Sequence, residues 1–355
     1  MIRFKCREIT HTLCYFLNTS VGRKASLPIL GISILSILPA ISYGCTEPTH
    51  AVPEESVRTA VRLMNSNKST TIEGGVADIL IFNDDRMQRL DAYQREKTSA
   101  CSTVKASCTS GHKIFSIVLN SQRDKYDWAD INSRECLTSI TSSLENEERQ
   151  KLLMSGECFS TAGMPVNIAM KRLSAEIVLR SLSCDFKGKA YEGQKLSDIK
   201  VYLTNVNTDA GLFAESPVIP TRLVNTGRLE PNDLATFKEP EMIMQEIPDP
   251  VGVEKVRPDI RLICYPNEAE AEVPGCPFTR LVIEGNLCGH TYYWPLDINR
   301  SSGGKGISRN CRYIFDITIT RTGQTDPDIP VKLEDSSIKT EIQPWEEKEE
   351  YGVRY

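Results

Sequence analysis

The stretch CRYIFDITITRTGQTDPDIPVKLEDSSIKTEIQPW, residues 311–345, joins two strand patterns through a segment that interrupts regular structure. Residues 311–321 are rich in β-branched and aromatic side chains, as is typical of a strand. Residues 322–330 are rich in Pro, Gly, Asp and Thr, which favour turns and linkers. The chain therefore carries a linker and a last segment, 322–355, after a strand that could complete a fold.

The last segment has the alternation of a strand with one apolar edge. Ile338, Thr340 and Ile342 alternate with polar residues, and the large aromatic Trp345 follows a proline. Such a strand can pair with the open sheet edge of another molecule and place alternate side chains in pockets. It can equally fold back as an edge strand of its own sheet, and the residues alone do not separate these alternatives.

Most of the remaining chain is also typical of strands. Residues 56–64 alternate, and 76–84 and 112–121 are more continuously apolar, as expected for strands covered on both faces. Further strands are predicted at 198–206, 278–285 and 290–299. We predict a mainly β chain of two tandem β-sandwich domains with one or two short helices. The expected bounds are 46–162 for the N-terminal domain and 163–321 for the C-terminal domain.

Two local features are expected within these domains. Cys136, Leu137, Ile140 and Leu144 lie at helical spacing, with Asn132 or Ser133 available as a cap. In 166–179 the apolar alternation resumes one residue out of register, which predicts a β-bulge at Lys171–Arg172.

Composition excludes some classes of function. The 355 residues are 40% hydrophobic and 25% charged, with a net charge of −5, which suits a soluble globular chain and argues against nucleic-acid binding. The four histidines are scattered, and no phosphate-binding loop or nucleophile elbow is present. Trp128 and Trp294 are single aromatics, for which core packing is favoured over a sugar platform. We expect no enzyme, no cofactor and no metal.

The N-terminus resembles an export signal. A basic lead precedes an apolar run from Leu27 to Ile41, which is short for a transmembrane helix and ends near Gly44-Cys45. We predict that 1–45 is a lipoprotein signal ending at an acylated Cys45, although an ordinary secretion signal is the alternative. Nine cysteines follow Cys45, an odd number, so at least one stays free or pairs between chains.

Residues 307–330, followed by IKTEIQPW (338–345), resemble the C-terminal signature of the fimbrillins, the type V fimbrial subunits of Bacteroidales, and of their anchor proteins. The resemblance implies two transthyretin-like β-sandwich domains, export as a lipoprotein and assembly by strand exchange. A protease removes the first strand of a polymerising subunit, and the C-terminal strand of the next subunit fills the groove. It makes Ile338, Thr340, Ile342 and Trp345 the donor strand, and the outer membrane and other fimbrial subunits the partners.

The resemblance also bears on the role within a fimbria. Stalk subunits of the family are cut after an Arg in the loop that follows the first strand, but 65–75 contains no Arg and only Lys68. Arg62 lies inside the expected strand. An uncut, lipid-tethered subunit describes an anchor, which we favour over a stalk or tip subunit cut at Lys68. A glycan-binding surface lipoprotein is a further alternative, and it predicts a last strand paired within its own chain.

Overall fold

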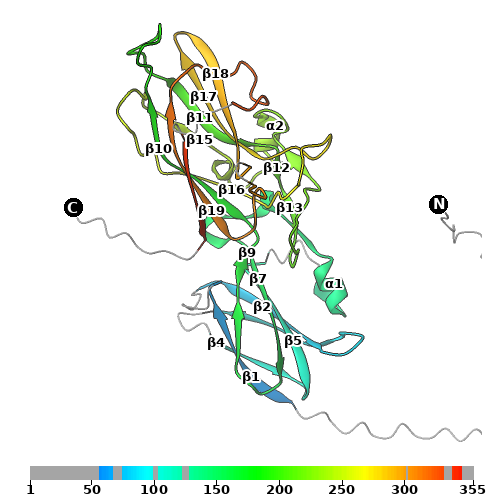
Figure 1. Ribbon diagram of the computed structural model, residues 1–355. Helices are drawn as coiled ribbons and strands as arrows, with labels where there is room; N and C mark the ends of the chain where they lie inside the picture. Colours follow the sequence, from blue (N-terminus) through cyan, green and yellow to red (C-terminus); the bar gives the residue numbers. More distant parts are fainter. Residues whose placement is uncertain are drawn as a thin grey trace, which may run out of the picture. The chain divides into compact units, whose positions relative to one another are not determined.

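The computed structural model describes residues 56–66, 74–98, 103–121, 128–300, 303–331 and 338–345. The described part is mainly β, with two short α-helices, and the predicted fold class is confirmed at that level (Figure 1). Four larger sheets form two sandwiches, which we call the N-terminal and C-terminal sandwiches. All their strands lie in one unit of the chain, Val52–Tyr355.

The N-terminal sandwich contains a three-stranded sheet in the order β4-β1-β8 and a five-stranded sheet in the order β3-β2-β5-β7-β9. Their bounds are β1 (Val57–Met64), β2 (Val76–Asn83), β3 (Leu90–Lys97), β4 (Thr103–Cys108), β5 (His112–Leu119), β7 (Met154–Thr161), β8 (Val166–Ala169) and β9 (Lys171–Arg172). Side chains between the sheets, including Leu63, Ile79 and Phe115, form one buried cluster.

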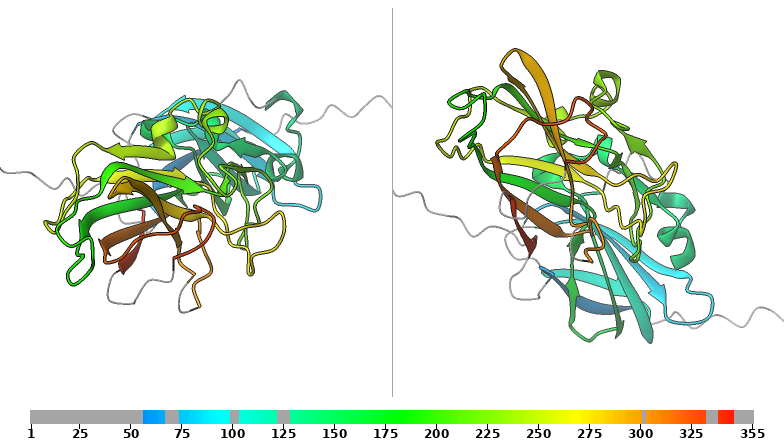
Figure 2. Two further views of the ribbon diagram at one scale, coloured as in Figure 1. Left: turned by 90° about the horizontal axis from the view of Figure 1, so that it is seen from above. Right: turned by 45° about the horizontal axis from the view of Figure 1, so that its top comes forward.

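The C-terminal sandwich contains two four-stranded sheets, in the orders β16-β10-β19-β20 and β15-β11-β17-β18. Their bounds are β10 (Ala175–Cys184), β11 (Ser197–Thr204), β15 (Met244–Ile247), β16 (Ile260–Cys264), β17 (Arg280–Leu287), β18 (His290–Asp297), β19 (Cys311–Ile319) and β20 (Ile338–Pro344). Figure 2 shows these strands from two further directions, with β20 in dark red beside β19.

Short elements complete the chain. They are α1 (Arg134–Thr138), α2 (Pro231–Leu234), the paired strands β6 (Thr141–Ser143) with β13 (Asp209–Gly211) and β12 (Val206–Asn207) with β14 (Leu223–Val224), and the 3₁₀ turns η2 (Trp128–Asp130), η3 (Leu144–Asn146), η4 (Arg149–Lys151) and η5 (Pro240–Met242). The larger core joins the C-terminal sandwich to the outer face of β2 and β5, where Leu80 and Ile114 meet Leu137 and Leu153. This second cover explains why β2 and β5 are apolar on both faces, as predicted.

The helix predicted from Cys136 to Leu144 is wrong in its second half. Ser133 does cap α1, because its hydroxyl accepts a hydrogen bond from the Cys136 amide at 3.4 Å, but the helix ends at Thr138. Residues Thr141–Ser143 instead pair with β13. Thr and Ser side chains compete for backbone groups and weaken a helix interior, so tertiary pairing decides this stretch.

The register shift at Lys171–Arg172 is a crossing between the two sandwiches, and the prediction of a bulge there is wrong. β8 pairs with β1 and β9 pairs with β7, whereas β10 begins the C-terminal sandwich at Ala175. The expected boundary at 162–163 thus falls ahead of β8 and β9, which pair within the N-terminal sandwich. A register irregularity does occur in β10, between Leu179 and Ser181.

A buried carboxyl fixes the segment that covers the N-terminal sandwich to the C-terminal one. Glu147 is 2% exposed and accepts hydrogen bonds from the Tyr265 hydroxyl and from the Leu153 amide, the latter at 3.0 Å. Burial raises the pKa of Glu147 to about 7, although both hydrogen bonds act in the opposite direction.

Candidate functional site

The first strand, β1, is the central strand of its sheet. It pairs antiparallel with β4 on one side and parallel with β8 on the other. Thr59, Val61 and Leu63 are fully buried, as the alternation of 56–64 predicted. Burial of Val61 and Leu63 contributes about 1.5–3 kcal/mol each to keeping β1 in place.

Removal of β1 would separate β4 from β8 and uncover an apolar floor. Val104 and Ala106 on β4, and Val166 and Ile168 on β8, are buried beside β1. A strand placed between β4 and β8 would have backbone partners on both edges and would bury alternate side chains. In the structure β1 occupies this position, between β4 and β8.

The candidate processing residue Arg62 has an exposed side chain, but its backbone lies opposite Thr103 on β4 and Asn167 on β8. A protease that binds its substrate as an extended chain must first detach β1 from both neighbours. Lys68 and Cys45 lie outside the described residues, so cleavage at Lys68 and acylation of Cys45 stay predictions.

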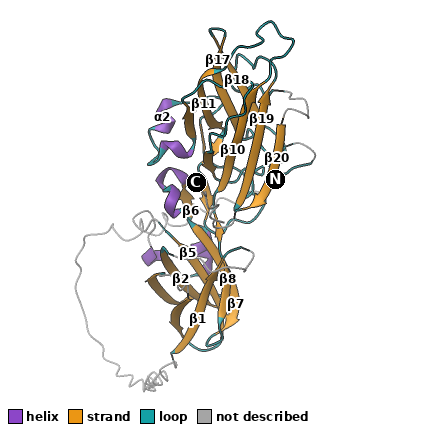
Figure 3. Cartoon of the chain, turned by 90° about the vertical axis from the view of Figure 1, so that its left-hand side faces the viewer, coloured by secondary structure: helices purple, strands orange, loops and turns teal. Residues whose placement is uncertain are grey.

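The predicted donor strand is paired within its own chain. β20 runs antiparallel to β19, from Ile338 opposite Ile317 to Pro344 opposite Cys311, and forms the edge of its sheet (Figure 3). This is the alternative in which the tail folds back on its own sheet, and it is also what the glycan-binding alternative expects. Arg62 and β20 lie in different sandwiches, so the structure does not bring them into one site.

The alternate side chains of β20 are incompletely covered. Ile338, Thr340 and Ile342 lie opposite the buried Ile317, Phe315 and Tyr313, and paired residues share a face of the sheet. Ile338 packs partly against the larger core, but Thr340 is exposed and Ile342 is 49% exposed. In its own sheet, β20 thus uses only part of its apolar edge.

Trp345 is the residue that fastens the tail. Its side chain is 7% exposed and belongs to the larger core, and its amide donates to the Asn310 carbonyl at 2.9 Å. Arg172 donates from Nη1 to the Trp345 carbonyl at 2.7 Å, and the Arg172 guanidinium carbon lies 4.7 Å from the centre of the Trp345 ring. Because Arg172 lies on β9, a strand of the N-terminal sandwich holds the end of β20. The sequence predicted that Trp345 belongs to the last strand, but it gave no indication that Arg172 contacts it.

An ion-pair network crosses the outer face at β20. Arg180 contacts Asp316 on β19 at 2.6 Å and Glu341 on β20 at 2.9 Å. The hydrogen bonds from Arg180 lower the pKa of Asp316 to about 2. Because Arg180 and Glu341 are each nearly half exposed, the pair that involves β20 contributes only about 0–1 kcal/mol.

The segment before the tail is docked on β18. Hydrogen bonds join Gln324 and Tyr293 in both directions, at 2.8 and 2.9 Å, and the Val331 amide donates to the Pro295 carbonyl at 3.1 Å. Residues 322–330 were expected as a linker that supplies reach to the tail. In this structure the same residues run along an edge strand and hold hydrogen bonds that must break before the tail can extend.

A buried arginine adds a side-chain clamp to this segment. Arg280 is 3% exposed and contacts Asp328 at 2.7 Å, Glu272 at 2.7 Å and Asp297 at 2.8 Å. Because Asp328 lies in the docked segment and Arg280 lies on β17, their ion pair fastens this segment to β17. The Asp328 side chain itself is 54% exposed.

The described residues provide little for catalysis. In these ranges no three His, Cys, Asp or Glu side chains are grouped to hold a metal ion, and the eight cysteines there are free thiols. Trp294 is 2% exposed and belongs to the core, as predicted. Trp128 is partly buried, packs against the larger core and stacks on Tyr93 with ring centres 6.2 Å apart. None of the helices that the structure describes is long and apolar enough to cross a membrane.

Comparison with known proteins identifies the fold. No family profile and no curated protein matches the sequence. A Bacteroides eggerthii protein assigned to cell adhesion has a TM-score of 0.63 and 16% identity, covering 82% of this chain and 96% of its own. A Parabacteroides distasonis protein with the same assignment has a TM-score of 0.61 and 15% identity, covering 82% and 97%.

The fimbrilin of Porphyromonas gingivalis has a TM-score of 0.57 and 15% identity, covering 81% of this chain and 97% of its own. At identities this low the likeness establishes the fold alone. The chain has the fold of Bacteroidales fimbrilins and adhesion proteins, and the resemblance found in the sequence is confirmed to that extent.

Proposed function

We propose that this chain is a structural subunit of cell-surface fimbriae, of the fimbrillin family, that assembles by strand exchange. The likeness to a fimbrilin and to adhesion proteins supports this proposal, because it extends over nearly the whole length of those proteins. The observation that carries the proposal is the unequal pairing of two strands: β1 has a neighbour on both edges, whereas β20 has one.

A strand gains backbone hydrogen bonds and apolar burial when it moves from the edge of a sheet to a groove between two strands. At the edge, β20 makes backbone hydrogen bonds to β19 alone and leaves Ile342 half exposed. In a groove of the kind that β1 fills, a second ladder would form, at about 0.5–1.5 kcal/mol net per hydrogen bond. Full burial of Ile342 would add roughly half of the 1.5–3 kcal/mol typical of such a side chain. These gains favour the exchange once a groove is open, and they act against the loss of the Trp345 contacts on release of the tail.

The side chains of the two strands are similar in pattern. β1 places Thr59, Val61 and Leu63 toward the core, and β20 presents Ile338, Thr340 and Ile342 on one face. The intervening residues of β20 are polar up to Gln343, whereas those of β1 are Arg58, Ala60, Arg62 and Met64. A groove shaped for a strand like β1 can accept a strand like β20, because alternate pockets set the specificity of strand addition.

We propose that the subunit acts as a membrane anchor or accessory subunit. Acylation of Cys45 would hold it to the outer membrane, and an intact β1 would occupy its own groove. The pairing of Arg62 on both sides supports this role, because it protects the strand from cleavage. A stalk or tip subunit cut at Lys68 remains the alternative. In either role the subunit donates β20 to another fimbrial subunit, and we propose that it has no catalytic turnover.

The experiment tests the tail in the native bacterium. Substitution of both Ile338 and Ile342 by Asp should abolish incorporation into fimbriae, because each change places a charge in an apolar pocket. Ile219→Asp is a matched control, since Ile219 is exposed to the same 49% as Ile342 but lies outside β20. The measurement is the amount of each variant in purified fimbriae relative to its amount in the cell. Incorporation of the double variant at the level of the control would refute the proposal.

A further inference from the structure

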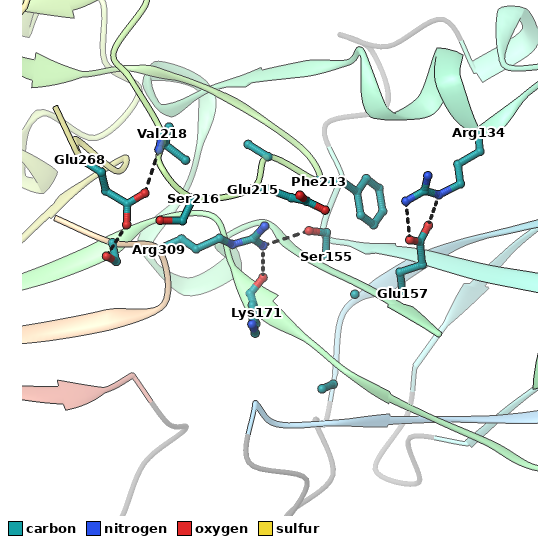
Figure 4. A pocket seen from close by; sticks show the side chains of 14 residues that line it. Arg134, Ser155, Glu157, Lys171, Phe213, Glu215, Ser216, Val218, Glu268 and Arg309 are labelled. Carbon is teal, nitrogen blue, oxygen red and sulfur yellow. Dashed lines mark hydrogen bonds and ion pairs between the residues drawn. The ribbon is translucent and has the colours of Figure 1, made fainter. Parts of the chain in front are cut away.

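A cavity of about 570 Å³ lies where β7, β8 and β9 of the N-terminal sandwich meet segments 213–218 and 308–309 (Figure 4). Its volume is within the range of small-molecule sites, which occur preferentially where domains meet. Neither β1 nor β20 lines this cavity. A ligand in this cavity would therefore contact neither β1 nor β20 directly.

Most charged groups in the cavity are already satisfied. Arg134 pairs with Glu157 through two hydrogen bonds of 2.8 and 2.9 Å. Glu268 accepts from the Val218 amide at 2.8 Å and from the Ser308 hydroxyl at 2.5 Å. Dashed lines in Figure 4 mark these contacts. Because these groups already have hydrogen-bond partners within the protein, we do not expect them to be the main contacts of a charged ligand.

Arg309 differs from these groups because it has no carboxylate partner among the residues that the structure describes. Its Nε donates to the Arg172 carbonyl at 3.1 Å, and its Nη2 donates to the Ser155 hydroxyl at 3.0 Å and to the Lys171 carbonyl at 2.9 Å. Within the same residues Nη1 makes no hydrogen bond. Burial lowers the pKa of Arg309 to about 10, which records the cost of holding this cation away from water. An anionic ligand that pairs with the guanidinium would offset this desolvation cost.

Lys171 adds a second cation at the rim. Its side chain is exposed, and its ammonium group forms no ion pair within the described ranges. Glu215, also exposed on the rim, is a carboxylate that lies near Arg134. The lining holds three cations, Arg134, Lys171 and Arg309, and three carboxylates, Glu157, Glu215 and Glu268, so its formal charges balance. Among the described residues, Arg309 is the buried cation of this set that no carboxylate pairs.

The remaining lining is suited to a sugar ring. Phe213 is partly exposed and offers an aromatic face, and Ser216 brings an exposed hydroxyl to the same cavity. Sugar rings pack on aromatic faces and exchange hydrogen bonds with hydroxyls and carboxylates such as Glu215. We propose that this cavity binds an acidic sugar, with its carboxylate on Arg309 and Lys171 and its ring against Phe213.

Binding is measured on the full chain by calorimetry with three probes. D-glucuronic acid should bind with a dissociation constant of about 1 mM or tighter. D-glucose, which has the same ring without the carboxylate, and acetate, which has the carboxylate without the ring, should each bind at least about tenfold more weakly, a difference of about 1.4 kcal/mol. Added salt should weaken the binding of glucuronic acid, since the attraction is electrostatic.

Variants locate the site. Lys171→Glu reverses the rim charge without removing the backbone carbonyl that Arg309 uses, and it should weaken glucuronic acid binding about tenfold. Phe213→Ala should weaken glucuronic acid but not acetate. Lys187→Gln, at an exposed lysine outside the cavity, is the control and should bind like the native chain. Equal affinity for glucose and glucuronic acid, no saturable binding, or an unaffected Lys171→Glu variant would each overturn the proposal.

Discussion

Replacement of Trp345 by Ala tests whether the tail is held mainly by the Trp345 side chain or by the pairing of β20 with β19. Trp345 is 7% exposed within the larger core, and the Arg172 guanidinium lies over its ring. Removal of a buried Trp side chain typically costs about 3–5 kcal/mol. Trp345 directly follows the edge strand β20, which can relax more than a central strand, so we expect about 3 kcal/mol. At roughly 2–4 °C per kcal/mol, the C-terminal sandwich should melt about 6–12 °C lower.

The matched comparison is Ile342→Ala, because Ile342 lies on the same strand but is 49% exposed. Because the Ile342 side chain is half exposed, its truncation should lower the free energy of unfolding by about 1 kcal/mol and the melting temperature by roughly 2–4 °C. Thermal unfolding followed by circular dichroism measures both variants, and limited proteolysis reports whether β20 is released before the sandwich unfolds. A Trp345→Ala variant that melts no lower than Ile342→Ala would refute the assignment of Trp345 as the anchor.

Three further predictions concern the membrane, the buried carboxyl and the docked segment. Cys45→Ser should move the protein from the membrane to a soluble fraction, since acyl chains contribute about 0.8 kcal/mol per buried methylene, and retention in the membrane would contradict acylation. Because the folded-state pKa of Glu147 is raised from 4.5 to about 7, its neutral form stabilises the fold below pH 4.5, and this contribution is lost as pH rises through 7. Denaturant titrations should therefore show that the free energy of unfolding of the native chain is lower at pH 8 than at pH 5, by an amount that approaches about 3 kcal/mol. This decrease should be largely absent in Glu147→Gln, and an equal decrease in both proteins would exclude Glu147 as its source. Asp328→Asn removes one contact of Arg280 and should speed proteolysis within 322–331 several-fold, whereas Asp249→Asn, at an exposed site elsewhere, should not.

The strands could be predicted because their signal is local. The alternation of Thr59, Val61 and Leu63 already fixes the buried face of β1, and the continuous apolar runs of β2 and β5 reflect cover on both faces. The strands predicted at 278–285 and 290–299 are joined by a tight turn, in which Cys288 and Gly289 adopt positive φ angles of 55° and 82°.

The contacts that hold the tail could not be predicted, because they join residues far apart in the chain. Arg172 and Trp345 are separated by 173 positions, and Arg280 and Asp328 by 48. Periodicity describes one segment at a time, so it gave no pairing for Arg172. It also described the shift at Lys171–Arg172 as a bulge, since a change of sheet and a bulge both displace the alternation by one residue. The alternation of 338–342 likewise gave no indication that Trp345 is buried, and this burial indicates that deletion of 336–355 would lower the melting temperature.

Self-pairing of the tail is compatible with exchange if the contacts divide into two kinds. The ladder between β20 and β19 uses backbone groups that any sheet edge offers, so it can be replaced by an equivalent ladder in another subunit. The Arg172–Trp345 contact and the Arg280–Asp328 contact use side chains of this chain, and nothing in an edge or a groove replaces them. In the proposed exchange, these two contacts, the burial of Trp345 and the hydrogen bonds of the docked segment to β18 would all oppose release of the tail, while a new ladder would favour it afterwards. If the proposed exchange occurs, these side-chain contacts would hold the partly covered strand β20 in its own sheet until a groove with two open edges becomes available.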